Sequence, residues 1–186
     1  MLSSSEVANL VIRARNGENE CFSTLVRAHY RAAYCSALAV VRAPDDARDV
    51  VQDALVSAFT ELESCREPER FSGWLLTIVR RRALMSLRRR GTARRVQELA
   101  AAEDAPQPAT PDVLLRERLL AAAEGLNDRQ AEVLFLHDLE GWTHPEIAQV
   151  LEISEVLSRQ VLFEARKKMR ARLSESARLS EPGGVP

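Results

Sequence analysis

Residues 141–162 read GWTHPEIAQVLEISEVLSRQVL, and this stretch has the length and apolar pattern of a helix-turn-helix. Thr143 can act as the N-cap of a first helix. Glu146, three residues later, completes a capping box, and Pro145 falls in the first turn, where its missing N–H does no harm. The inner face of this helix would consist of Ile147, Ala148 and Leu151. The sequence therefore predicts a helix over residues 144–151, followed by a turn.

The second helix of this motif is predicted over residues 154–173, with Ser154 as its natural N-cap. Leu162, Ala165 and Met169 would return to the core, which leaves a polar and basic face outside. Arginine and glutamine suit base edges because each can make paired hydrogen bonds, and further basic residues suit phosphates. The candidate DNA-reading residues are Ser154, Glu155, Arg159, Gln160, Phe163, Arg166 and Lys167. A helical hairpin with a solvated basic face would show the same pattern, so that alternative stays open.

Nearer the start of the chain, residues 46–63 are predicted to form an amphipathic helix. Its apolar stripe consists of Val50, Val51, Ala54, Leu55, Ala58, Phe59 and Leu62. Asp49, Gln52 and Asp53 are left together on the opposite face. Such an acidic face suits a basic groove on a protein partner, although many acidic faces are simply solvated.

The next predicted helix, over residues 71–90, is strongly basic. Eight arginines and no acid lie between residues 77 and 96, whereas residues 44–69 hold eight acids and two arginines. The candidate nucleic-acid contacts of this helix are Arg80, Arg81, Arg82, Arg88, Arg89 and Arg90. Phe71 and Trp74 could stack on unpaired bases, but aromatic residues at helical spacing usually belong to a core, so we assign both to packing.

Apolar residues recur at helical spacing along nearly the whole chain, and no sustained period-two alternation indicates strands. The sequence therefore predicts an all-α fold. The remaining helices are predicted over residues 5–15, 20–40, 111–124 and 128–136.

Two small helical domains are predicted, over residues 1–93 and 113–175. Pro106, Pro108 and Pro111 disfavour continuous helix between them, so residues 94–112 are interpreted as a flexible linker. The last residues, 176–186, have little apolar surface to bury and are predicted to form a flexible tail.

The composition limits the classes of function. The 26 basic and 27 acidic residues almost cancel, so only the charge distribution points to a polyanionic partner. No signal peptide and no apolar run of about 20 residues is present, which predicts a cytoplasmic protein without membrane insertion.

Cys21, Cys35 and Cys65 are neither paired as Cys-x-x-Cys nor grouped with histidines, so we expect reduced thiols and no metal site. No phosphate loop or nucleophile pattern appears, so we expect neither a catalytic site nor a cofactor.

Two parts of the chain resemble a known family. Residues 45–54 (DDARDVVQDA) followed by residues 71–80 (FSGWLLTIVR) resemble region two of the extracytoplasmic-function (ECF) sigma factors, in the sigma-70 family. Residues 126–134 (LNDRQAEVL) and the helix-turn-helix resemble region four of the same proteins. The order and separation of the two parts agree with that family.

This resemblance implies a protein that binds bacterial RNA polymerase core and directs promoter-specific initiation of transcription. Asp49, Gln52 and Asp53 would contact the polymerase clamp helices, and the arginines of residues 80–90 would engage the minus-ten promoter element. Region four would bind the minus-thirty-five element and the polymerase flap. The resemblance also implies an anti-sigma factor as a further partner.

Several positions depart from the family pattern. Arg81 and Met85 stand where asparagine and aspartate are common, and Glu152 occupies the turn where glycine is usual. Val156 and Leu157 replace a frequent Gly-Thr pair. Two other functions therefore stay open: a helix-turn-helix regulator that acts without polymerase, and a protein that docks on polymerase without opening promoters.

Overall fold

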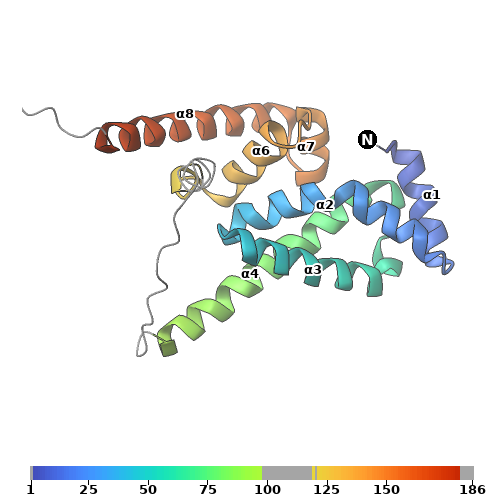
Figure 1. Ribbon diagram of the computed structural model, residues 1–186. Coiled ribbons are helices and arrows are strands. Elements are labelled where there is room, and N and C mark those ends of the chain that lie inside the picture. Colours follow the sequence, from blue (N-terminus) through green and yellow to red (C-terminus); the bar gives the residue numbers. More distant parts are fainter. Residues whose placement is uncertain (1, 98–118, 120, 181–186) are drawn as a thin grey trace, which may run out of the picture.

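The computed structural model describes residues 2–97, 119 and 121–180. The regular elements in these ranges are all helical, which confirms the predicted fold class (Figure 1). The first half contains α1 (Ser4–Arg15), α2 (Asn19–Val41), α3 (Pro44–Thr60), the short 3₁₀ helices η1 (Leu62–Ser64) and η2 (Pro68–Arg70), and α4 (Phe71–Gln97). The second half contains α6 (Asp128–Asp138), α7 (His144–Leu151) and α8 (Glu155–Ser180).

The first half is built around α2, which packs against α1, α3 and α4. The largest side chains that its helices bury almost completely are Leu25, Phe71, Leu75 and Leu76. Phe71 and Leu75 lie one turn apart on α4, as an apolar stripe at helical spacing requires. The assignment of Phe71 to packing is therefore confirmed, and Trp74 lies partly buried beside it, with the two ring centroids 5.7 Å apart.

The second half is the predicted helix-turn-helix, with α6 packed beside it. α7 has the predicted bounds, and the Glu146 carboxylate accepts hydrogen bonds from the Thr143 N–H at 2.7 Å and the Thr143 hydroxyl at 2.6 Å. The side chains expected on its inner face, Ile147, Ala148 and Leu151, are buried. Ser154 caps α8 by accepting a hydrogen bond from the Leu157 N–H at 3.1 Å.

Two helices continue beyond their predicted ends. α4 runs to Gln97 rather than residue 90, through the first positions of the predicted linker, and α8 runs to Ser180 rather than residue 173, through the first positions of the predicted tail. Both extensions are free of proline, and Gly91 alone costs a helix only about 1 kcal/mol, so nothing in these segments stops the helix. The rest of the predicted linker and tail lies outside the described residues.

The two halves pack directly on one another. α6 lies along α2, and α7 approaches α4, so buried residues of both halves join in one core (Figure 1). Gly73 of α4 faces the backbone of Val150 in α7, which a Cβ at residue 73 would meet at 3.5 Å. This packing places the basic helix of the first half beside the helix-turn-helix.

Candidate functional site

The acidic face predicted on α3 is present at the surface. Asp49, Gln52 and Asp53 are all exposed, while Val50, Val51, Ala54 and Ala58 on the other side of the helix are buried. Val56 lies one turn beyond these acids and is 62% exposed, so an apolar side chain extends the acidic face. We predicted Phe59 in the buried stripe, and this prediction is wrong: its side chain is 48% exposed and its ring contacts Phe22 edge-on. Phe59 lies one turn after the partly buried Leu55, at the margin of the apolar stripe.

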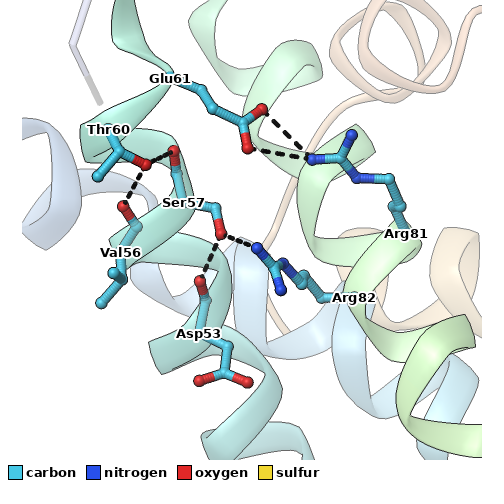
Figure 2. A network of polar contacts seen from close by, with 7 residues as sticks. All are labelled: Asp53, Val56, Ser57, Thr60, Glu61, Arg81 and Arg82. Carbon is cyan, nitrogen blue, oxygen red and sulfur yellow. Dashed lines mark hydrogen bonds and ion pairs between the residues drawn. The ribbon is translucent and has the colours of Figure 1, made fainter.

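A polar network fixes α3 against α4 (Figure 2). The Arg82 guanidinium donates to the Ser57 hydroxyl, which in turn donates to the Asp53 carbonyl oxygen at 3.0 Å. Arg81 pairs with Glu61 at 3.3 Å. The partly buried Arg82 therefore holds the two helices together. Arg81 is about half exposed, and an exposed ion pair of this kind contributes only about 0–1 kcal/mol, so a phosphate could replace Glu61.

The other predicted contacts on α4 differ in their surroundings. Arg80 pairs with Glu132 of α6 at 2.9 Å, across the contact between the halves. Arg88 and Arg89 are exposed farther along α4. The side chain of Arg90 lies outside the described part of the structure. Among the five predicted minus-ten contacts whose side chains are described, the structure thus separates surface residues from residues that pack helices together.

The predicted DNA-reading surface of α8 is exposed along its length. All seven candidate residues are exposed: Ser154, Glu155, Arg159, Gln160, Phe163, Arg166 and Lys167. Leu162 and Ala165 are buried and Met169 is partly buried, as predicted. Val156 and Phe163, 72% and 65% exposed, lie two turns apart and place apolar surface among the polar groups. Apolar side chains in a major groove can contact thymine methyl groups.

Both arginines expected on this surface already have carboxylate partners. Arg159 pairs with Glu155 at 3.1 Å, and Arg166 donates to Asp138 of α6 at 2.5 and 3.1 Å. Burial acts to raise the pKa of Asp138, but the hydrogen bonds from Arg166 and His137 outweigh it and lower that pKa. These pairs hold the guanidinium groups in place, and DNA would have to compete with the carboxylates for them.

A polar contact that no sequence pattern predicted joins the two helices of the motif. The Ser158 hydroxyl is buried on α8 and lies 2.9 Å from Nδ1 of His144, the first residue of α7. Burial, followed by the influence of nearby His137 and of the cations Arg159 and Arg166, lowers the pKa of His144. Because this pKa is lowered, the ring is predominantly neutral at pH 7 and can pair with the hydroxyl. His144 thus orients α8 relative to α7.

The turn of the motif is strained at Glu152. This residue has φ 53° and ψ 47°, the left-handed conformation that its non-glycine side chain disfavours. We predict that Glu152→Gly raises the free energy of unfolding by about 1 kcal/mol, because glycine removes the clash of Cβ. Urea unfolding followed by circular dichroism measures this change.

The matched control for that prediction is Glu164→Gly, at an exposed position inside α8. Glycine there should lower the free energy of unfolding by about 1 kcal/mol, because glycine loses more backbone entropy than other residues when it becomes part of a helix. Equal destabilisation by both substitutions would contradict strain at Glu152.

His29 and the cysteines are shielded from solvent. Burial lowers the pKa of His29 to about 4, so its ring is neutral at pH 7, and its Nδ1 lies 3.4 Å from the Ser72 hydroxyl. Cys21, Cys35 and Cys65 are free thiols and are buried. Burial first, and then the nearby Glu140 carboxylate, raise the pKa of Cys35 to about 12.

The described residues hold neither a candidate metal site nor a membrane-spanning helix. No group of three or more histidines, cysteines or acids within residues 2–97 and 121–180 could hold a metal ion. In the same part of the chain, no helix combines the length and the apolar character that a membrane span requires.

Comparison with known proteins finds one family match in each half of the chain. Residues 25–93 match the family described as Sigma-70 region 2, and residues 116–169 match Sigma-70, region 4. A structure of CnrH in complex with the cytosolic domain of CnrY has a TM-score of 0.68 and 25% identity, and covers 91% of this chain and 98% of that one. RpoE of Bartonella quintana, in a structure with the anti-sigma factor NepR, has a TM-score of 0.61 and 23% identity over 82% and 96% of the two chains.

Among curated relatives, the RNA polymerase sigma factor CarQ of Myxococcus xanthus is 29% identical over 88% of this chain and 95% of its own length. The probable sigma factor RfaY of Xanthomonas campestris is also 29% identical, over 91% of this chain, but the match spans only 46% of its length. The fold defines an all-helical protein with a helix-turn-helix, a motif typical of DNA-binding proteins. With both sigma regions present in order, the chain belongs to the sigma-70 family as an RNA polymerase sigma factor of the ECF type.

Proposed function

We propose that the acidic face of α3 is the surface that docks on the core polymerase. Asp49, Gln52 and Asp53 would meet basic groups of the clamp helices, and Val56 would pack between them. A row of carboxylates on a rigid helix supports this assignment, because charge complementarity orients a partner and speeds its association. The exposed position of all three polar residues is the observation that carries the proposal.

The DNA contacts in this proposal come from both halves. Arg81, Arg88 and Arg89 of α4 would hold the backbone of the minus-ten element, where Arg80 would join them once it leaves Glu132. Arg82 would position α3 and α4 through Ser57, and Arg90 would extend the basic row. On α8, Arg159 and Gln160 would read base edges of the minus-thirty-five element. Ser154, Arg166 and Lys167 would donate to phosphates, and Phe163 would contact thymine methyl groups. Glu155 would accept a hydrogen bond from a cytosine amino group.

The proposal includes an anti-sigma partner and assigns no chemical step to this chain. CnrH and RpoE, the two solved structures described above, were each determined with a bound protein partner, which is the anti-sigma factor NepR in the case of RpoE. A similar partner here would cover the polymerase-binding or DNA-binding surfaces. The protein would act by binding, in the bacterial cytoplasm where polymerase and promoter DNA meet.

Run-off transcription with purified bacterial core polymerase and a pool of promoter fragments tests this proposal. Wild-type protein should produce discrete transcripts that core polymerase alone does not. Arg159→Ala should reduce them about 10-fold to 100-fold, because a base contact contributes about 1–3 kcal/mol.

Arg129→Ala is the matched control, since Arg129 is an exposed arginine of α6 outside the proposed DNA surface, and it should transcribe like the wild type. DNA binding by the free protein without polymerase-dependent transcripts would instead indicate a helix-turn-helix regulator that acts alone.

A further inference from the structure

Val156 points away from the core of the helix-turn-helix. It lies in the first turn of α8, directly after Glu155, where that helix begins. Its exposure of 72% is the largest among the large apolar side chains in the described part of the chain. The fully buried Ala165 follows nine residues later, and nine residues make about two and a half helical turns. Val156 therefore lies on the opposite side of α8 from the core.

The residue after Val156 turns inward. Leu157 is partly buried and packs against the core, so of these two residues Val156 alone is exposed. Arg159 and Gln160 are its exposed neighbours one turn farther along α8. Arg159 is held by Glu155 at 3.1 Å, which places an ordered ion pair beside Val156. In a helix-turn-helix, the N-terminal residues of the second helix contact base edges in the major groove. Val156 thus lies in the part of α8 that would come closest to the bases.

The chemistry of a valine side chain limits what it can recognise there. Valine has neither a hydrogen-bond donor nor an acceptor, so it cannot replace the water bound to N7, O6, O4 or an amino group of a base. A polar group that is covered without a hydrogen bond weakens binding. Thymine presents a 5-methyl group in the major groove, and this group gains from apolar contact. The stiff χ1 angle of valine keeps the entropy loss of such a contact small. Contact with Val156 should therefore favour thymine over the other bases.

We infer that Val156 selects a thymine in the minus-thirty-five element by contact with its 5-methyl group. This inference rests on the proposed function of α8 and adds a base that Arg159 and Gln160 do not account for. Phe163 lies seven residues farther along the same face, which is about 10 Å along the helix axis. Base pairs are stacked about 3.4 Å apart, so Val156 and Phe163 would contact bases about three pairs apart. The thymine selected by Val156 is thus distinct from the base that Phe163 contacts.

Replacement of thymine by deoxyuridine tests the inference, because this change removes the 5-methyl group and keeps every hydrogen-bonding group of the base. Holoenzyme assembled from the full-length chain and bacterial core polymerase first selects its preferred sequence from duplexes randomised across the minus-thirty-five element. Each thymine of that sequence is then replaced in turn, and equilibrium binding is measured. At the position contacted by Val156, the wild type should bind the deoxyuridine duplex about fourfold more weakly, the loss expected for one buried methyl group.

Three variants assign the contact to its residue. Val156→Ala should bind the thymine and deoxyuridine duplexes equally well at that position, because the shortened side chain no longer reaches the methyl group. Val156→Ile keeps an apolar side chain of sufficient length and should keep the fourfold difference. The matched control is Ile12→Ala, which shortens a half-exposed side chain of α1 outside the proposed DNA surface and should respond to deoxyuridine like the wild type. Circular dichroism verifies that each variant is folded.

A wild type that is insensitive to deoxyuridine at every position would overturn the inference. A Val156→Ala variant that keeps every sensitivity of the wild type would overturn it too, because other residues would then contact the methyl groups. In both cases the selected minus-thirty-five sequence would still support the proposed function of α8. A holoenzyme that selects no sequence in this element would overturn that function together with the inference.

Discussion

Neutralising Asp49 and Asp53 together should weaken binding to core polymerase by about 100-fold or more. Loss of one partner from a buried interfacial charge pair costs about 2–5 kcal/mol, and about 3 kcal/mol in total already corresponds to a factor of more than 100. We therefore expect Asp49→Asn/Asp53→Asn to lose run-off transcription at protein concentrations that saturate the wild type. Equilibrium binding to labelled core polymerase measures the effect directly.

Glu20→Gln/Glu63→Gln is the control for this prediction, because it removes two equally exposed charges from α2 and η1. This variant should bind core polymerase within about twofold of the wild type, since exposed ion pairs contribute little. Similar losses in both double variants would show that overall charge, and not the face of α3, governs binding. The α3 face would then lose its proposed role.

Truncating Phe71 to alanine should lower the free energy of unfolding by about 3–5 kcal/mol. The side chain is fully buried at the start of α4, with its ring centroid 5.5 Å from that of His29 and 5.7 Å from that of Trp74. Alanine would remove the apolar contacts and leave a cavity among rigid neighbours. Guanidinium unfolding followed by circular dichroism measures the loss.

Phe163→Ala makes the same chemical change at a residue that is 65% exposed, so the free energy of unfolding should change by less than about 0.5 kcal/mol. The same variant should weaken binding to minus-thirty-five DNA, where Phe163 is proposed to offer apolar contact. A stability loss as large as that of Phe71→Ala would contradict the surface position of Phe163.

Local signals in the sequence were sufficient to predict where the helices of the helix-turn-helix begin. Thr143, Pro145 and Glu146 specify the start of α7, and Ser154 specifies the start of α8, because capping depends on residues within one turn. The ends of α4 and α8 were less predictable. Prolines suggested a linker after α4, and the low apolar content of the last residues suggested a flexible tail after α8. Proline, however, interrupts a helix only close to its own position.

The packing between the halves could not be read from the sequence. Ser36 and Glu132 are 96 residues apart, and no local pattern shows that a glutamate on α6 will be buried by α2. The same limit applies to Arg82. Its place in a basic run predicted a DNA contact, but its bond to Ser57 depends on how α3 and α4 pack. The exposure of the polar residues on α3 and α8 was predictable from helical spacing, whereas Phe59, at the end of α3, shows that spacing does not decide every position.

The burial of the three thiols limits how this protein can respond to oxidants. A thiol reacts with peroxide as its thiolate, and a pKa of about 12 leaves only about one Cys35 molecule in 100,000 in that form at pH 7. Cys21 and Cys65 are likewise buried, out of reach of bulky reagents. Oxidants would therefore react slowly with these three thiols. A signal that starts from oxidants would then reach this protein through a binding partner and not through its own thiols.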